Sequence, residues 1–414
     1  DNENDGDGSP TPAAVEPEIR VLDDGTAMVV TKPSLDKGKG AAVSAVSAEL
    51  MRKALGRAKT ASDGIRKVMF EIPEIKGAGR YTLRLPASAL SSGEGDIRIK
   101  MATPLGTLSL PGNMFNGGGL TGEDDDIELT IGRADTAGLA EDIRRQIGER
   151  PVIELNARAG GRVINWNNPD APVTVSIPYT PTEEELKDPE HIVVWYIDGQ
   201  GNITPVPNGR YDPAAGEVTF TITHFSKYAT AFVKKTFADI QNYPWAKKEI
   251  EVLASKGIIE GMSASSYAPG SNITRADFVT LLVRALELKA SFDGNFDDVK
   301  ASDYYYDTVG TAKKLGIIEG VGDNKFDPKA GITREDMMVM AAGAMEAAGK
   351  IKDDADISVL SAYTDSASVS SYAVASAAAL IENGIIEGDG SLINPEGNTT
   401  RAETAVVIYR IYNK

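Results

Sequence analysis

The stretch Gly257-Ile258-Ile259-Glu260-Gly261 decides how the C-terminal part of this chain folds, because the same five residues return twice. They recur as Gly316-Ile317-Ile318-Glu319-Gly320 and as Gly384-Ile385-Ile386-Glu387-Gly388. A Thr-Arg pair follows each copy at a similar distance: Thr274-Arg275, Thr333-Arg334 and Thr400-Arg401. A two-part signal that returns roughly every sixty residues predicts three repeated units that share one core.

The residues around each copy have the periodicity of helices. In the first unit, apolar residues at helical spacing form two stripes: Ala246, Ile250, Leu253 and Ala254, then Phe278, Leu281, Leu282, Ala285 and Leu286. Each unit is therefore predicted to be helix, loop, helix. The first glycine of each string is expected to end the first helix, and the isoleucine pair is expected to lie in the core.

Composition excludes several classes of protein. The 414-residue chain has a net charge of -17, no cysteine, and two histidines, His191 and His224. Disulfides and thiolate metal sites are therefore excluded, a histidine-rich metal site is disfavoured, and no cofactor is predicted. The acidic balance disfavours nucleic acid as a partner, because such proteins normally present a basic face. No apolar run is long enough to span a membrane.

The part before the repeats has a different pattern. Residues 1–17 are acidic and rich in Gly and Pro, which predicts a flexible linker. Because the chain starts at Asp1 without a methionine or signal peptide, it is expected to be a processed form or a fragment. Residues 18–235 are predicted to form a β-rich, sandwich-like domain with helical insertions at 41–57 and 137–148. Its expected strands include 67–72, 81–85, 127–131, 173–177, and a closing hairpin from Val193 to Ile222.

Further residues recur in register in the three units. Each opens with an aromatic residue two positions before an aspartate, places another aromatic at the head of its first helix, and has x-Pro before the Thr-Arg-x-acid motif. The opening aspartates are Asp239, Asp298 and Asp365, and the helix-head aromatics are Trp245, Tyr304 and Tyr372. This pattern resembles a triplet of S-layer homology (SLH) modules, with repeats at 236–291, 292–358 and 359–414.

The resemblance implies non-covalent anchoring of a surface protein to a Gram-positive cell wall. It implies an all-α, pseudo-threefold, three-pronged unit whose grooves bind secondary cell-wall polysaccharide, often capped by pyruvylated N-acetylmannosamine, or another polymer linked to peptidoglycan. Self-assembly into a surface layer is a further possibility for such proteins. The binding residues that the resemblance carries over are Arg275, Arg334, Arg401, Asp239, Asp298, Asp365, Trp245, Tyr304, Tyr372, Gly261, Gly320 and Gly388.

The chain departs from the family pattern at a few positions. Repeat 2 has Glu335 where alanine is usual. Repeat 3 is one residue shorter in its loop, opens with Tyr363, and has Ile393 at the aromatic position before x-Pro.

The chemistry of the residues leaves alternatives for each role. The Thr and acid of Thr-Arg-x-acid fit a helix capping box. The arginine does not fit, because a cation in the first turn faces the positive end of the helix dipole, which costs about 0.3–1 kcal/mol. Two explanations remain: an anion that bridges the guanidinium and the helix N-terminus, or an ion pair with an opening aspartate. Those aspartates are alternatively N-caps, and the helix-head aromatics are either core residues or platforms for sugar rings.

Other signals are weaker. His224-Phe225-Ser226 resembles the cleavage motif of some autoproteolytic β-domains, against the alternative of a structural strand. The acidic run 123–126 is either a calcium loop or a solvated turn. Trp166 and Trp195 are the candidates for sugar binding by the β-rich domain, with a core role as the alternative. No nucleophile-base pair or carboxylate dyad stands out, so the chain is predicted not to be an enzyme.

Overall fold

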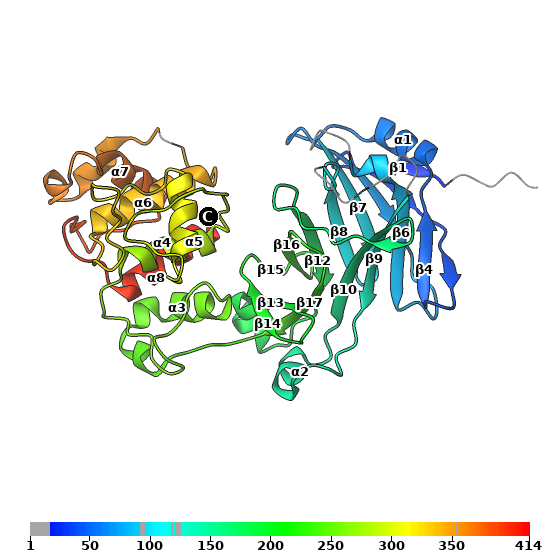
Figure 1. The fold of residues 1–414 in the computed structure, drawn as a ribbon, viewed down its shortest axis with the longest axis horizontal. Helices are drawn as coiled ribbons and strands as arrows, with labels where there is room; N and C mark the ends of the chain where they lie inside the picture. Colours follow the sequence, from blue (N-terminus) through cyan, green and yellow to red (C-terminus); the bar gives the residue numbers. More distant parts are fainter. Residues whose placement is uncertain (1–16, 92–95, 117–119, 121–125, 353) are drawn as a thin grey trace, which may run out of the picture. The chain divides into compact units, whose positions relative to one another are not determined.

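The computed structural model describes residues 17–91, 96–116, 120, 126–352 and 354–414. The predicted linker 1–17 and the acidic run 123–126 fall outside these ranges, apart from residues 17 and 126. The chain forms two compact units (Figure 1). The first contains residues 1–135, 152–178 and 221–227, and the second contains 136–151, 179–220 and 228–414. The second unit thus includes residues 179–220 and 228–235, which the sequence pattern grouped with the β-rich domain.

The first unit is rich in sheet. Its elements are β1 (Ile19–Val21), β2 (Ala27–Val30), β3 (Ser34–Asp36), β4 (Ala41–Ala45), α1 (Ala48–Arg57), β5 (Arg66–Glu71), β6 (Arg80–Pro86), β7 (Ile97–Thr103), β8 (Gly106–Pro111), β9 (Asp126–Arg133), β10 (Val152–Ala159), β11 (Arg162–Val163) and β12 (Val173–Pro178). One sheet has the order β1-β2-β5-β7-β8-β12, and the other has β10-β9-β6-β4-β3 with β11 beside β10. Both sheets are mixed, since β2-β5, β5-β7 and β4-β6 are parallel pairs.

Alternation of buried and partly exposed residues gives each sheet an apolar face. In β5, Val68 and Phe70 are buried between half-buried neighbours, and in β9 Ile127, Leu129 and Ile131 follow the same pattern. The expected strands at 67–72, 81–85, 127–131 and 173–177 are present within a residue or two.

One prediction about the first unit was wrong in part. Residues 41–57 were expected to form one helix, but β4 occupies Ala41–Ala45 and α1 begins only at Ala48. Ser47 caps this helix by accepting from the amide of Leu50. The run Ala41-Ala42-Val43-Ser44-Ala45 pairs in parallel with β6, and this tertiary pairing overrides the weak helical pattern of its alanines.

The second unit contains an α-helix and short strands before the repeats, and further helices within the repeats. Its strands are β13 (Ile192–Ile197), β14 (Ile203–Val206), β15 (Arg210–Asp212), β16 (Glu217–Ile222) and β17 (Lys227–Phe232), the last two of which include residues of the first unit. Its helices are α2 (Glu141–Ile147), α3 (Pro244–Ser255), α4 (Arg275–Ala285), α5 (Tyr306–Lys314), α6 (Arg334–Ala347), α7 (Val374–Glu382) and α8 (Arg401–Asn413). The coarse prediction, a sheet-rich part followed by helices in the repeats, is confirmed.

The three repeats share one apolar core. The six isoleucines of the repeated string are all buried in it: Ile258, Ile259, Ile317, Ile318, Ile385 and Ile386. Helix α4 packs against α5, α6 and α8, so residues far apart in sequence meet at the centre. The first glycine of each string, Gly257, Gly316 or Gly384, has a φ of 71°, 72° or 69°, as expected where a helix ends.

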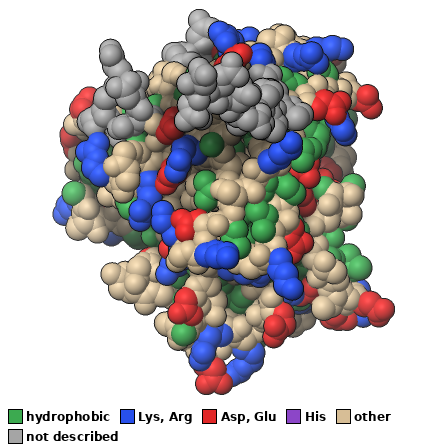
Figure 2. Space-filling view, turned by 90° about the vertical axis from the view of Figure 1, so that its right-hand side faces the viewer, with side chains coloured by type: hydrophobic (Ala, Val, Ile, Leu, Met, Phe, Trp, Pro, Cys, Tyr) green, Lys and Arg blue, Asp and Glu red, His purple; other side chains and the backbone are tan. Residues whose placement is uncertain are grey.

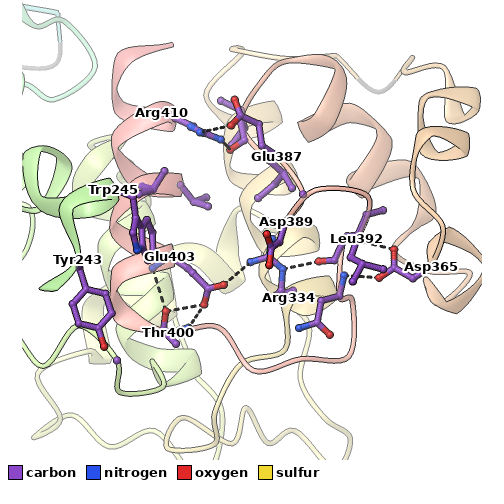
Figure 3. Close-up of a pocket in the computed structure, with 18 residues that line it drawn as sticks. Tyr243, Trp245, Arg334, Asp365, Glu387, Asp389, Leu392, Thr400, Glu403 and Arg410 are labelled. Carbon is purple, nitrogen blue, oxygen red and sulfur yellow. Dashed lines mark hydrogen bonds and ion pairs between the residues drawn. The ribbon is translucent and has the colours of Figure 1, made fainter.

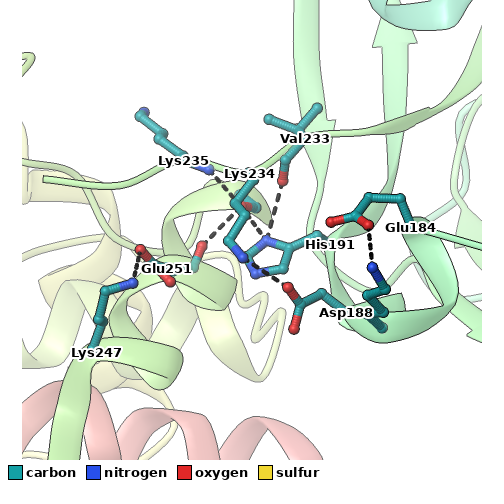
Figure 4. A network of polar contacts seen from close by, with 10 residues as sticks. Glu184, Asp188, His191, Val233, Lys234, Lys235, Lys247 and Glu251 are labelled. Atoms are coloured by element: carbon teal, nitrogen blue, oxygen red, sulfur yellow. Dashed lines mark hydrogen bonds and ion pairs between the residues drawn. The ribbon is translucent and has the colours of Figure 1, made fainter. Parts of the chain in front are cut away.

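The segment before the repeats is joined to α3 by polar contacts (Figure 4). His191 Nδ1 lies 2.9 Å from Ser255 Oγ and 3.1 Å from the carbonyl of Val233. Ser255 Oγ donates in turn to the carbonyl of Glu251, and the amide of Lys235 donates to Ser255 Oγ. We call the contacts of residues 188–212 and 233–235 with α3, Lys256 and α8 the seam.

The seam extends to the end of the chain. Tyr412 donates its hydroxyl to the carbonyl of Pro207 at 2.6 Å, and the Arg210 guanidinium lies 3.9 Å from the centre of the Tyr412 ring. Arg210 Nη1 also donates to Asn413 Oδ1 at 2.8 Å. Residues 188–212 are thereby tied to both the first and the last helix of the repeats.

Charge on the surface is mixed in sign. On the face drawn in Figure 2, Lys and Arg side chains are interspersed with Asp and Glu. In the part of the chain that the structure describes, no helix is long and apolar enough to cross a membrane.

Candidate functional site

The start of each second helix is fixed by hydrogen bonds from two directions. The capping threonine accepts from the amide three residues on: Thr274 from Asp277, Thr333 from Asp336, and Thr400 from Glu403. The backbone amides of the two residues that follow each threonine donate to carbonyls of another repeat. In repeat 1, Arg275 donates to Ala330 and Ala276 to Pro328. The equivalent pairs are Arg334 to Gly397 and Glu335 to Pro395 in repeat 2, and Arg401 to Ser271 and Ala402 to Pro269 in repeat 3.

These contacts close a cycle in which repeat 1 meets repeat 2, repeat 2 meets repeat 3, and repeat 3 meets repeat 1. They also explain how an arginine is tolerated in the first helical turn, since partial negative charge from two carbonyls faces the positive end of each helix. Because the first three amides are occupied, an anion at these positions would bind through the guanidinium and not through the helix N-terminus.

The opening aspartates hold the loop of their own repeat. Each accepts from two consecutive loop amides: Asp239 from Tyr267 and Ala268, Asp298 from Phe326 and Asp327, Asp365 from Ile393 and Asn394. Burial raises the pKa of Asp239, but hydrogen bonds from Ser266, Tyr267 and Ala268 outweigh it and the net pKa is lowered. With their oxygens occupied in this way, the aspartates are positioned to shape the loop.

The arginines hold the same loop residues from the other side. Their Nε atoms donate to carbonyls in the next repeat of the cycle: Arg275 to Phe326 at 3.1 Å, Arg334 to Ile393 at 2.8 Å, and Arg401 to Tyr267 at 2.8 Å. An opening aspartate thus binds the amide of this residue while an arginine binds its carbonyl. The structure brings the predicted arginines and aspartates together through one backbone residue and not through an ion pair.

Two of the arginines pair instead with the acid of a neighbouring Thr-Arg-x-acid motif. Arg275 Nη1 lies 2.7 Å from Asp336 Oδ2, and Arg334 Nη1 lies 3.2 Å from Glu403 Oε1. Arg401 forms no ion pair with any described residue. Its Nη2 donates to the carbonyl of Glu260 at 2.9 Å, and its guanidinium lies over the ring of Tyr267.

The helix-head aromatics lie on the surface. Trp245, Tyr304 and Tyr372 are 53%, 68% and 57% exposed, so they are not core residues. Tyr304 donates its hydroxyl to Asp277, and Tyr372 donates to Glu335 and Asp336. Burial and then the hydrogen bond to the carboxylate raise the pKa of both phenols.

Equivalent residues therefore define three junctions between repeats. Each consists of an arginine, an acid and an exposed aromatic from three different repeats. Contacts define junction 2 (Arg275, Asp336 and Tyr372) and junction 3 (Arg334, Glu403 and Trp245). The equivalent residues Arg401, Asp277 and Tyr304 define junction 1, in which Tyr304 binds Asp277.

Junction 3 contains a groove of about 990 Å³ (Figure 3). Trp245 and Tyr243 line it from repeat 1, and Glu403 and Arg410 line it from α8. Arg410 Nη2 forms an ion pair of 2.8 Å with Glu387, the acid of the third Gly-Ile-Ile-Glu-Gly string. The groove has the size of a small-ligand site, with an aromatic side chain on one wall and polar groups along another.

The second glycines of the repeated strings have a packing role. A side chain at Gly261, Gly320 or Gly388 would collide with a loop carbonyl and with the opening aromatic ring of the same repeat. Their part in binding, which the resemblance implied, remains a prediction.

Sequence reasoning assigned Asp277, Asp336 and Glu403 to helix capping alone. The Glu403 carboxylate completes a capping box by accepting from the Thr400 amide, whereas the Asp277 carboxylate accepts from the Thr274 hydroxyl. Asp336 and Glu403 also bind an arginine, and Asp277 and Asp336 also bind a tyrosine. The sequence does show an acid two residues after each motif arginine. However, each arginine pairs with the acid of another repeat, about sixty residues away, and no local pattern indicates that pairing.

Outside the repeats, the weaker candidates have structural partners. The carbonyls of Thr223 and Ser226 accept from the amides of Asn168 and Leu155, and Phe225 lies 4.9 Å from Trp166 between ring centres. Trp166 and Trp195 are both buried. Within the ranges described, no group of three or more His, Asp or Glu side chains could hold a metal ion.

Comparison with known proteins identifies the repeats. The S-layer homology domain family matches residues 236–279, 295–338 and 362–405. Residues 236–405 therefore hold three S-layer homology domains, which confirms the predicted family.

The chain is also similar to segments of much longer proteins. It is 40% identical over 235 residues to an amylopullulanase of Thermoanaerobacterium thermosulfurigenes, a match covering 56% of this chain and 12% of the relative. It is 42% identical over 184 residues to the exoglucanase XynX of Acetivibrio thermocellus, covering 43% of this chain and 16% of the relative. It is 32% identical over 186 residues to the surface-layer 125 kDa protein of Lysinibacillus sphaericus, covering 44% of this chain and 15% of the relative.

The chain thus spans less than a fifth of the length of each of these three relatives. The domains and these relatives confirm the predicted location at the surface of a Gram-positive bacterium, and they support cell-wall anchoring.

Proposed function

We propose that this chain anchors a surface protein non-covalently to the cell wall by binding an acidic secondary wall polysaccharide at the junctions between its SLH domains. The polymer would be of the pyruvylated N-acetylmannosamine type. The observation that carries the proposal is the recurrence, at each junction, of an arginine and an exposed aromatic side chain from different repeats.

The two kinds of side chain suit the two parts of such a sugar. A guanidinium binds a carboxylate with charge-assisted hydrogen bonds worth about 1.5–3 kcal/mol each. An exposed indole or phenol ring packs against the apolar face of a pyranose ring. Two occupied junctions on one polymer would add avidity without any new contact.

We also propose the finer form of the fold, a pseudo-threefold three-pronged unit. The cyclic backbone contacts support it, because each repeat gives the start of its second helix to the loop of the next. In that arrangement every binding junction takes residues from all three repeats, so a single domain would not bind on its own.

The test is sedimentation with purified cell walls. A variant in which Trp245, Tyr304 and Tyr372 are all alanine should lose most wall binding while keeping its fold, since the three side chains are mainly exposed. Leu186→Ala is a matched control, an exposed apolar residue before the repeats. Replacing Arg275, Arg334 and Arg401 together should also abolish binding, and walls stripped of pyruvate should not retain the wild-type chain. Wall binding that survives both triple substitutions would refute the proposal.

We further propose that the sheet-rich unit is a spacer without enzyme activity, although two of the relatives above are named as enzymes. The backbone hydrogen bonds at Thr223 and Ser226 support the structural interpretation of the His224-Phe225-Ser226 segment. Gel analysis of Ser226→Ala against wild type tests this, because self-cleavage would give two wild-type fragments and one intact variant chain.

A further inference from the structure

The three junctions are alike in sequence pattern but differ in charge pairing. In junctions 2 and 3 the motif arginine is neutralised inside the protein: Arg275 by Asp336 and Arg334 by Glu403. Their side chains are 8% and 11% exposed. An external anion at either arginine would have to displace a carboxylate that is already in place.

Junction 1 lacks this internal neutralisation. Asp277, the acid equivalent to Asp336 and Glu403, accepts instead from the hydroxyls of Thr274 and Tyr304. Arg401 is left with two carbonyl partners, from Tyr267 and Glu260, and no carboxylate among the described residues. It is also more exposed than Arg275 and Arg334, which are buried.

A second arginine contacts the same glutamate as Arg401. Arg284 lies on α4, nine residues after Arg275, and its Nη1 is 3.6 Å from the carboxylate of Glu260. Arg401 binds the carbonyl of that same glutamate, so two guanidinium groups meet at Glu260. The Glu260 side chain is 73% exposed, so its ion pair with Arg284 is weak and easily exchanged for a ligand carboxylate.

Junction 2 differs in the opposite direction. The position equivalent to Arg284 and Arg410 is Gly343, so the second arginine is missing. Glu319, equivalent to Glu260, is exposed and has no ion pair within the described residues. Glu335, at a position where alanine is usual in the family, adds a carboxylate that holds Tyr372 and Ser370. Local charge at junction 2 therefore repels an anion.

We propose that junction 1 is the single site that accepts the carboxylate of the wall polymer, through Arg401 and Arg284, which contact the same glutamate. Junction 3, whose two arginines are both paired and whose groove is lined by Trp245, contacts uncharged sugars, and junction 2 does not bind an anion. This inference rests on the proposed function and limits carboxylate binding to one of the three junctions.

The test uses the full chain and a defined probe, the methyl glycoside of N-acetylmannosamine carrying a pyruvate ketal, with the ketal-free glycoside for comparison. Isothermal titration of wild type should give one site per chain for the ketal and weaker binding for the neutral glycoside. Arg401→Gln should weaken ketal binding about 10- to 100-fold, the loss expected for one or two charge-assisted bonds. Arg401→Lys, which keeps the charge, should retain part of the affinity.

A gain-of-function variant makes the test sharper. Glu403→Gln keeps the capping pattern of Thr400 but removes the charge that neutralises Arg334, so a second ketal site should appear in junction 3. Two or three equal sites in wild type, unchanged affinity in Arg401→Gln, or equal losses in Arg401→Gln and Arg401→Lys would each overturn the inference.

The outcomes also separate this inference from the proposed function. A wild-type chain that binds walls but not the ketal probe would overturn the anion assignment and leave anchoring intact. A wild-type chain that does not bind walls at all would refute anchoring itself.

Discussion

Lys256, the C-cap residue of α3, is a buried cation in the seam. It is 3% exposed, and its Nζ donates at 2.6 Å to the carbonyls of Ile192 and of Gly209. No carboxylate within the described residues forms an ion pair with it. Burial, and then the positive charge of Arg210, lower the pKa of Lys256 from 10.5 to about 7, against an opposing effect of Glu190.

This pKa makes the stability of the second unit depend on pH. The folded protein releases the Lys256 proton near pH 7 and the unfolded chain near pH 10.5, so unfolding takes up a proton between those values. Stability therefore rises with pH in this window, by at most about 1.4 kcal/mol per pH unit and about 5 kcal/mol in total. The two carbonyls favour the charged ammonium, so the measured gain should lie below that limit.

The experiment compares urea unfolding of wild type and Lys256→Met from about pH 6 to about pH 9.5, below the titration of unfolded tyrosines. Methionine fills similar space but cannot titrate, so the free-energy difference between the two proteins should shift in favour of wild type as pH rises. His191 has a lowered pKa through burial, but it is present in both proteins and its contribution cancels. Lys314→Met, at an exposed position on α5, should run parallel to wild type. Parallel profiles for Lys256→Met as well would refute the reasoning, because they would mean that the buried amine keeps an ordinary pKa.

Three more predictions concern the repeats. Asp298→Asn should lower stability by about 1–3 kcal/mol in thermal unfolding, because the single amide oxygen of Asn cannot accept from the backbone amides of both Phe326 and Asp327. An unchanged melting temperature would show that these two hydrogen bonds do not stabilise the loop. Gly320→Ala should lower stability, measured by urea unfolding, more than Gly316→Ala does. The new methyl at position 320 would collide with a loop carbonyl and an aromatic ring, whereas the methyl at position 316 would meet no neighbour and alanine there would only adopt an unfavourable φ. A fragment of residues 179–414 should unfold at a higher temperature than 236–414, because only the longer one keeps the seam, and equal melting temperatures would show that the seam contributes nothing.

Much of the repeat fold could be predicted because its signals are local. The apolar stripes at 3.6-residue spacing identified the helices, and Gly257 and its equivalents identified where the first helices end. Thr274, Thr333 and Thr400 were recognisable as N-caps for the same reason, since the groups they bind lie three residues away.

What could not be predicted depends on contacts between distant residues. Asp239 reaches amides 28 and 29 residues away, and no periodicity shows which amides an aspartate will bind. The pairing of Arg275 with Asp336 crosses from one repeat to the next. The contacts of the seam could not be predicted either. Lys256 and Tyr412 bind backbone carbonyls, which every residue type has, so the residue types at Ile192 and Pro207 do not indicate these contacts.

The glutamate of the repeated string shows why identical sequence does not give identical chemistry. Glu387 pairs with Arg410, Glu260 pairs loosely with Arg284 while its carbonyl binds Arg401, and Glu319 has no basic partner in the described chain because Gly343 replaces the arginine. The backbone of the three strings is fixed by the same glycines and isoleucines, so the three strings keep the same local fold despite these differences. The fold therefore depends on the repeated positions, whereas the charge pairing at each junction depends on the positions that vary.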